Sequence, residues 1–372
     1  MENAAQENWQ TLLSLFPPLW RERAGESGAV ERLRGFSSAE ALLRTLLLHI
    51  ANGFSLRETV VQAKLAQLAK VSDVALLKRL RNSEEWLRRL CVDLLRENGM
   101  ALATQARKKR LRIVDGTIVK EPGKTGSQWR ILYSLQWPAL SCDFFEISAT
   151  AGEGTGESFR RLPIEPQELV LGDAGYWSTE GIAFVRQQRA DVLVRVNPQN
   201  FTAYGPQGRR VQLLRRLRTI RQSGEMGEWK VVLRAGNVSV QGRICAIRKS
   251  ELAIQQAHRR LLRKASKMQT TPRPQTLEYA KYVIVFTTLA TESVSQVLEC
   301  YRLRWQIELA FKRMKTLAHL GHLPKHDDRS ARAWLYGKLL VALLTQKLIR
   351  VGRDISPWGY SLPVASSDKP LA

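Results

Sequence analysis

The stretch Leu298–His319, LECYRLRWQIELAFKRMKTLAH, determines how the rest of the chain is interpreted. It contains no Gly or Pro and many strong helix formers, so it predicts one continuous helix. At about 100° per residue, four polar side chains share an arc of roughly 60° on that helix: Tyr301, Arg304, Glu308 and Lys315. An apolar stripe suited to packing on a core lies beside this arc and comprises Leu303, Ile307, Ala310, Phe311, Met314 and Leu317.

This helix has two interpretations. Taken alone, it is more typical of a solvated amphipathic helix in which Arg304 and Glu308 form an i,i+4 ion pair. Alternatively, its mixed acidic, basic and aromatic face holds a polyanion beside a metal ion. Other segments of the chain distinguish these two interpretations.

The composition favours a polyanionic partner. The 372 residues contain 58 Lys and Arg against 34 Asp and Glu, a formal net charge of +24, which makes nucleic acid the leading candidate. A membrane surface would also attract this charge, but no apolar run approaches the roughly 18 residues of a membrane-spanning helix. The N-terminus lacks a signal-peptide pattern, and the four cysteines include no CxxC pair. We therefore expect a cytoplasmic protein with reduced thiols.

Residues 1–108 are predicted to form a helical domain. Ser38, Ser55 and Ser72 are suited to cap the N-termini of helices, and Gly53 and Gly99 to end them. Two short helices within 55–82 have the proportions of a helix-turn-helix, whose second helix carries Lys78, Arg79 and Arg81. The pattern indicates a DNA-binding domain, although an ordinary helical bundle with a basic surface remains an alternative.

The segments that follow predict an α/β fold with a mixed sheet. Three β-rich segments precede a β-α-β unit, so we assign the core to residues 109–197 and 286–350. A β-rich insertion, 198–285, separates the two parts; it has strand-like pieces, among them VQLLRRLRTI at 211–220, and a basic helix at 251–267. The tail, 351–372, has little pattern and is expected to be partly disordered.

Two aspartates follow apolar strand residues. Asp115 comes after LRIV and Asp173 after LVLG, at positions where an unpaired carboxylate is costly to bury. A structural Asp-Gly turn would also explain Asp115. Together with Glu308, however, these acids supply hard oxygen ligands of the kind that suit Mg²⁺ or Mn²⁺. Two such ions support in-line displacement at a phosphodiester.

The sequence does not support a nucleotide-binding motif or a histidine metal site. Gly123-Lys124-Thr125 resembles the end of a P-loop, but the motif's first glycine would fall on Ile118. The glycines at 152, 154 and 156 open no clear helix, which argues against a dinucleotide site. His319, His322 and His326 are interrupted by Gly321 and Pro324, so we expect phosphate or surface contacts from them rather than a metal site.

The residues match a known family pattern. Asp115-Gly116-Thr117 and Gly172-Asp173-x-Gly175-Tyr176 precede a Tyr301, Arg304, Glu308, Lys315 helix. This arrangement resembles the DDE transposases of bacterial insertion sequences, in particular the subgroup with a Tyr-Arg-Glu-Lys helix. The resemblance covers about residues 110 to 345. The acids are separated by 58 and 135 residues (173 − 115 and 308 − 173), and the second gap is long enough for the β-rich insertion of this subgroup.

The resemblance implies an RNase H-like core in which Asp115, Asp173 and Glu308 hold two divalent ions, Mg²⁺ or Mn²⁺. It also implies that Tyr301, Arg304 and Lys315 contact the DNA backbone at the transposon end. Trp305 matches an aromatic position that stacks near the cleaved end. Trp229 in the insertion is a candidate to receive a flipped base. Ala174 departs from the family, since many relatives carry a basic residue there.

The function implied is cut-and-paste transposition. Metal-activated water would cleave at the element's end, the 3′-OH would form a hairpin, and after resolution it would attack target DNA. The implied partners are terminal inverted repeats and target DNA, with a homodimer in the synaptic complex. Two alternatives remain from the sequence: an RNase H-like nuclease without strand transfer, and an inactive DNA-binding relic acting as a repressor.

Overall fold

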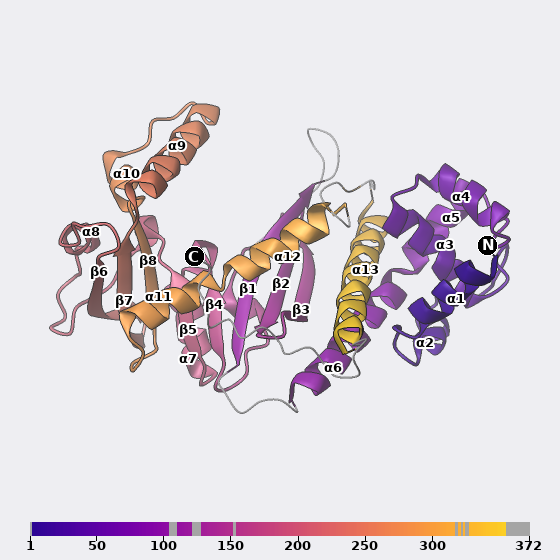
Figure 1. Cartoon of the computed structure of the whole chain (residues 1–372), viewed down its shortest axis with the longest axis horizontal. Helices are drawn as coiled ribbons and strands as arrows, with labels where there is room; N and C mark the ends of the chain where they lie inside the picture. Colours follow the sequence, from indigo (N-terminus) through magenta and orange to yellow (C-terminus); the bar gives the residue numbers. More distant parts are fainter. Residues whose placement is uncertain are drawn as a thin grey trace.

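The N-terminal part of the chain is helical (Figure 1). The computed structural model describes residues 2–103, 110–120, 128–151, 154–316, 319–320, 323 and 327–354. Within 2–103 the helices are α1 (Glu2–Leu13), α2 (Trp20–Glu26), α3 (Ala39–Asn52), α4 (Leu56–Leu65), α5 (Asp73–Asn82) and α6 (Glu84–Ala103).

Side-chain caps define the ends of these helices as predicted. Ser38 accepts a hydrogen bond from Ala41 N at α3, and Ser55 forms a reciprocal capping box with Glu58 at α4. Gly53 ends α3 at φ 72°, a conformation that glycine adopts without strain. The predicted end at Gly99 is wrong, because α6 continues to Ala103. A glycine inside a helix costs only about 1 kcal/mol, and the buried leucines of α6 outweigh that cost.

A mixed sheet follows, which confirms the predicted RNase H-like fold class. Its strands run in the order β3-β2-β1-β4-β5-β8-β7-β6. The strands β1 (Leu111–Lys120), β2 (Gln128–Trp137) and β3 (Ser141–Ala149) are antiparallel neighbours, whereas β4 (Leu169–Gly172) and β5 (Asp191–Arg195) continue parallel to β1. The other strands, β6 (Met226–Ala235), β7 (Val238–Arg248) and β8 (Tyr282–Thr287), extend the sheet in antiparallel fashion.

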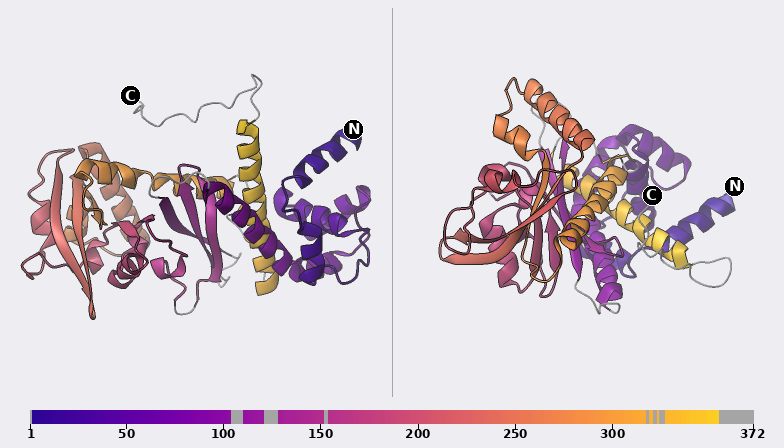
Figure 2. Two further views of the ribbon diagram at one scale, coloured as in Figure 1. Left: turned by 90° about the horizontal axis from the view of Figure 1, so that it is seen from below. Right: turned by 60° about the vertical axis from the view of Figure 1, so that its left-hand side comes forward.

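The strands of the region predicted as an insertion therefore belong to the same sheet as the core. The strand expected over 211–220 is wrong, because α8 (Leu213–Leu217) forms there. Leu213 and Leu217 are both buried, and a spacing of four places them on one face of a helical turn. The helices α9 (Glu251–Lys267) and α10 (Pro274–Tyr279) form an arm that projects from the end of the sheet (Figures 1 and 2).

Each face of the sheet packs against its own set of helices. One face is covered by α11 (Val294–Arg302), α12 (Trp305–Thr316) and α13 (Asp328–Asp354), and the other by α7 (Thr179–Gln187). Short 3₁₀ turns are η1 (Phe159–Arg161), η2 (Ala174–Tyr176) and η3 (Pro198–Asn200). Alternate residues of β1 reach opposite faces: Ile113 joins the core under α12, and Val114 joins the core over α7.

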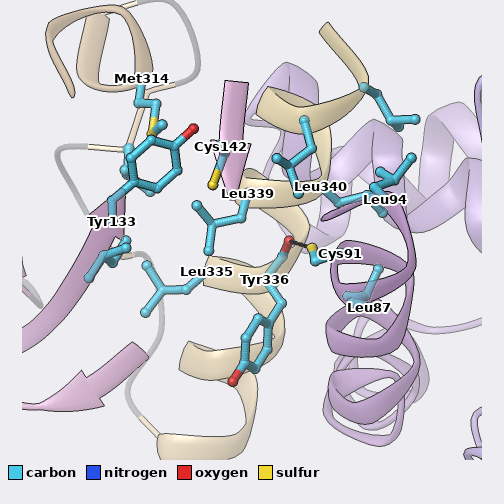
Figure 3. Close-up of a cluster of buried hydrophobic side chains, with 14 of the residues drawn as sticks. Leu87, Cys91, Leu94, Tyr133, Cys142, Met314, Leu335, Tyr336, Leu339 and Leu340 are labelled. Atoms are coloured by element: carbon cyan, nitrogen blue, oxygen red, sulfur yellow. Dashed lines mark hydrogen bonds between the residues drawn. The ribbon is translucent and has the colours of Figure 1, made fainter. Parts of the chain in front are cut away.

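Helix α13 joins the helical part to the sheet. Figure 3 shows its leucines packed between α6 and the strands β2 and β3, and Cys91 donates to the Tyr336 carbonyl oxygen at 3.4 Å. Ion pairs border the same contact: Arg81–Asp327, Arg332–Glu84 and Lys347–Glu97. None of the described helices is both long and apolar enough to span a membrane.

A buried ion pair ties β1 to the segment entering β4. Arg112 donates to both carboxylate oxygens of Glu168, at 2.9 and 3.0 Å, and also lies 3.2 Å from Asp143. The side chains of Arg112 and Glu168 are 5% and 1% exposed. Because a buried charge is costly unless it is compensated, this pair favours the observed register of the two strands, and Asp143 adds a second counter-charge to Arg112.

We expect Glu168→Gln to lower the free energy of unfolding by about 3–5 kcal/mol, the usual cost of breaking one side of a buried pair. Urea unfolding followed by circular dichroism measures this loss. The matched control is Arg302→Ala, which breaks the exposed Arg302–Glu299 pair and should cost less than about 1 kcal/mol. Equal effects in the two variants would contradict the assignment.

Candidate active site

The β1–β4 pairing places Asp115 beside Asp173. In the parallel register Ile113 pairs with Leu171, so the residues two further along each strand are the two aspartates. Because side chains alternate, both aspartates belong to the face that α12 covers. Asp173 directly follows β4, as expected, and accepts from Gly175 N at 2.7 Å. Asp115 was expected at a strand end, but β1 continues beyond it to Lys120.

The single helix predicted over 298–319 is wrong. α11 ends at Arg302 and α12 begins at Trp305, with a turn at Leu303 and Arg304 between them. The turn is held by i→i−3 hydrogen bonds, Arg304 N to Tyr301 O at 3.1 Å and Ile307 N to Arg304 O at 3.2 Å. This tighter winding rotates the two halves relative to each other, so one helical wheel does not describe the four polar residues.

Arg304, in this turn, connects two of the three acids. Its guanidinium lies 3.6 Å from Asp115 Oδ2 and donates to Glu308 Oε1. The side chains of Arg304 and Asp115 are 16% and 14% exposed, whereas that of Glu308 is 36% exposed. The i,i+4 ion pair of the first interpretation therefore forms, and the same guanidinium also lies beside the carboxylate of Asp115.

The other predicted contacts differ in how far they are exposed. Tyr301 is buried, its hydroxyl has no hydrogen-bond partner among the described residues, and burial raises its pKa. Trp305 is 57% exposed. Lys315 is exposed on α12.

An open depression of about 460 Å³ lies where α12 crosses β1. Glu308 and Lys315 from α12 and Gly116 and Thr117 from β1 are among its lining residues. A carboxylate, a lysine and the residues that follow Asp115 thus border the same surface, which is open enough to admit an extended polyanion.

Glu157 is a fourth acid at this place, and the sequence interpretation missed it. A Cβ added to Gly116 would lie 2.6 Å from Glu157 Oε1, and one added to Gly175 would overlap Glu157 Oε2. The carboxylate therefore lies between the glycines that follow Asp115 and Asp173. In the sequence, Glu157 is marked only by its position directly after the glycine-rich loop. No known spacing relates it to Asp115, Asp173 and Glu308.

The charges of these acids are poorly compensated. Burial raises the pKa of Asp115 to about 7, and the nearby Asp173 carboxylate contributes in the same direction. The pKa of Glu157 is also raised, first by burial and then by Asp173. Crowded oxygen donors of this type match the ligands that hard divalent cations prefer.

The described side chains of this cluster have the oxygen donors that a divalent cation prefers, but they do not form a preformed coordination site. Within the described ranges no three His, Cys, Asp or Glu side chains are already arranged to hold a metal. Between Asp115 and Glu308, Arg304 provides the positive charge instead. Metal binding by Asp115, Asp173 and Glu308 would therefore require this guanidinium to give up its contacts.

The remaining candidates stay outside this cluster. Trp229 is partly buried and packs against the core over α7. His319 is exposed. His322, His326, the Gly123-Lys124-Thr125 motif and the tail from 355 lie outside the described residues.

The chain is similar to known transposases along nearly its whole length. The family model described as "Transposase DDE domain" matches residues 106–344. InsL of insertion sequence element IS186A in Escherichia coli (strain K12) is 33% identical over 365 residues, which cover 95% of this chain and 97% of that protein. The transposase for insertion sequence element IS421 of Escherichia coli is 33% identical over 366 residues, with the same coverage. The transposase for IS231F of Bacillus thuringiensis subsp. israelensis is 24% identical over 265 residues, covering 63% and 56%.

Asp115 should make the stability of the metal-free protein depend on pH. Its folded pKa of about 7 lies above the ordinary value of 3.8, so the folded state retains a proton that the unfolded chain releases between these values. The resulting stability is complete below pH 3.8 and is lost as the pH rises through 7. We expect Asp115→Asn, measured by urea unfolding with chelator, to gain stability over the wild type progressively from pH 5 to 8.

Glu299→Gln is the control, because this exposed carboxylate on α11 is 62% accessible. Its stability difference from the wild type should stay constant across the same pH range. A constant difference for Asp115→Asn as well would show that Asp115 is ionised throughout.

Proposed function

Since this chain belongs to the DDE transposase family and is a DNA transposase of the bacterial insertion-sequence type, we propose that Asp115, Asp173 and Glu308 are its catalytic carboxylates. The observation that supports the proposal is the β1–β4 register, which pairs Ile113 with Leu171, two residues before Asp115 and Asp173, on the sheet face under α12. Glu308 extends from α12 toward the same place and shares Arg304 with Asp115.

DDE transposases depend on divalent metal ions, so this chain is a metal-dependent enzyme. We propose Mg²⁺ or Mn²⁺ as the metal, with two ions per site held by Asp115, Asp173 and Glu308. When bound, the ions supply an activated oxygen nucleophile and stabilise the leaving oxygen of an in-line displacement. Arg304, which pairs with Asp115 and Glu308 in this structure, would be available for a DNA phosphate if these carboxylates held metal ions.

The polar residues of α11 and α12 then position the DNA. We propose that Arg304 and Lys315 contact the phosphate backbone at the transposon end, with Lys315 at the open depression beside β1. The exposed ring of Trp305 is available to stack near the cleaved end. Tyr301 is buried, so its proposed backbone contact requires the α11–α12 turn to adjust.

One active site can carry out all the reactions of the proposed sequence. We propose cleavage at the element's end, hairpin formation by the released 3′-OH, hydrolysis of the hairpin by water, which frees that 3′-OH again, and its attack on target DNA. Each step displaces one oxygen at phosphorus, so the same carboxylates serve all of them without a covalent link between protein and DNA. A buried Tyr301 hydroxyl is consistent with this scheme, since no protein nucleophile is needed.

We propose that residues 1–108 form a DNA-binding domain and that 55–82 act as its helix-turn-helix. Helices α4 and α5 are joined by a short loop there, and Lys78 is exposed on α5. The other two basic residues of α5 have partners within the chain: Arg79 lies against Phe36, and Arg81 pairs with Asp327. Lys78 is accordingly the strongest candidate for DNA contact on this helix.

The proposed partners are terminal inverted repeats and target DNA, met in the cytoplasm at the nucleoid. The net charge of +24 supports extensive contact with phosphates. We further propose that two copies act together in a synaptic complex. Exposed apolar side chains near the end of α13, Leu348 and Ile349, support a protein contact in that region.

The carboxylates are tested by Asp115→Asn, Asp173→Asn and Glu308→Gln in the full chain with its terminal-repeat DNA and Mg²⁺. We expect cleavage and strand transfer to fall by at least about 10²–10³-fold, as when one group that stabilises transition-state charge is lost. DNA binding, measured by gel shift, should remain. Glu299→Gln is the control and should keep full activity. Retained cleavage in one variant would remove that residue from the site, and cleavage without joined products in the wild type would indicate a nuclease.

Lys315 is tested by the salt dependence of end binding. We expect Lys315→Ala to weaken binding and to reduce the slope of log K against log salt by about one, the value for one lost phosphate contact. Fluorescence anisotropy with labelled terminal-repeat DNA measures both quantities. Arg186→Ala, on α7 at the opposite face of the sheet, is the matched control and should leave the slope unchanged. An unaltered slope for Lys315→Ala would place this lysine on a merely solvated surface.

A further inference from the structure

The loop that carries Glu157 is fixed at both ends of the acid. Two residues later, Phe159 is fully buried, and its ring packs on Tyr176 with centroids 5.0 Å apart. On the other side Arg161 donates to the carbonyl oxygens of Thr155 and Gly156, at 2.7 and 2.8 Å, and also binds Glu146 at 2.8 Å. The position of Glu157 is therefore built into the fold rather than left to a free surface loop.

Two glycines create the space that its carboxylate occupies. Gly116 directly follows Asp115 on β1, and Gly175 is the backbone donor to Asp173. A side chain at either glycine would collide with an oxygen of Glu157. The carboxylate thus enters the site from the side of the sheet opposite α12. Within the described part of the chain it accepts no hydrogen bond, and the charge of Arg130 acts to lower its pKa.

Tyr176 provides a second observation at this cluster. Its side chain is 1% exposed, and its hydroxyl has no partner among the described residues. After burial, the charges of Glu157, Asp115 and Asp173 are the largest influences that raise the pKa of this phenol. A buried donor without an acceptor is costly, and the charges that most affect the pKa of this hydroxyl are those of the three carboxylates, that of Glu157 first.

We propose that Glu157 is a fourth metal-binding carboxylate of this site, approaching from the side of Gly116 and Gly175, and that Tyr176 is a positioning residue for it. The proposal rests on the proposed function of Asp115 and Asp173. Asp173 would then be flanked by acids on both sides: Asp115 under α12 and Glu157 across the end of β4. Glu308 completes the α12 side, and Glu157 closes the opposite side.

The first test is Mn²⁺ binding to the full chain with terminal-repeat DNA, followed by electron paramagnetic resonance of free Mn²⁺. We expect Glu157→Gln to weaken Mn²⁺ binding by about 10- to 100-fold, since even outer-shell partners of a bound metal contribute that much. Cleavage at low Mn²⁺ should fall in parallel and recover partly at high Mn²⁺. Glu180→Gln, an exposed acid in the first turn of α7, is the matched control and should behave as the wild type.

The second test moves the carboxylate without removing it. In Gly116→Ala the added methyl group displaces the end of the Glu157 side chain, so Mn²⁺ affinity should fall in the same direction. The double variant Gly116→Ala, Glu157→Gln should be no weaker than the more affected single variant, because both changes act on one contact. Tyr176→Phe keeps the ring packed on Phe159 and should reduce Mn²⁺ affinity less than Glu157→Gln does.

The outcomes separate this inference from the proposed function. Wild-type Mn²⁺ affinity in folded Glu157→Gln, alongside its loss in Asp115→Asn, would overturn the role of Glu157 and leave the three-acid site standing. Unchanged Mn²⁺ binding in Asp115→Asn and Asp173→Asn would instead overturn the proposed site. If Glu157→Gln fails to fold by circular dichroism, Gly116→Ala decides: normal Mn²⁺ affinity there counts against the proposal.

Discussion

The parallel pairing of β1 with β4 is the constraint on which the rest of the site depends. It brings Asp115 close to Asp173, and burial, followed by the charge of Asp173, raises the pKa of Asp115 to about 7. The fold compensates at the opposite ends of the two strands, where Arg112 and Glu168 form a buried ion pair. The ion pair at the Arg112 end thus stabilises the strand pairing against the unfavourable burial of Asp115 at the other end. That other end, with Asp115 and Asp173, is the one suited to bind cations.

Arg304 compensates part of the negative charge of this acidic cluster. The break between α11 and α12 brings its guanidinium between Asp115 and Glu308, so the metal-free chain has a cation at its acidic centre. An unbroken helix would keep Arg304 on one helical face with Glu308. The break is therefore part of how the site is neutralised, and tight i→i−3 winding inside a helix is common at functional positions.

Much of the fold was predictable from local patterns, and the site only in part. LRIVD and LVLGD are apolar strands that run into acids, and their spacing to Glu308 indicated the family. Serine caps and Gly53 marked helix ends because they act locally. The helix break, the α8 turn and Glu157 depend on contacts between distant segments, which one sequence read by periodicity does not contain. Glu157 in particular follows a long loop, and its position is set by Phe159 and by two glycines on other elements.

In the proposed mechanism, metal binding and DNA binding both involve Arg304. A chain with a net charge of +24 has its acids gathered where phosphate oxygens are to react, so repulsion between those acids and DNA must be removed before the DNA can approach. If the proposed carboxylates hold the metal ions, the ions would reduce that repulsion and would take over the compensation that Arg304 now provides. The guanidinium would then be available to the same DNA, so metal binding and DNA binding would favour each other.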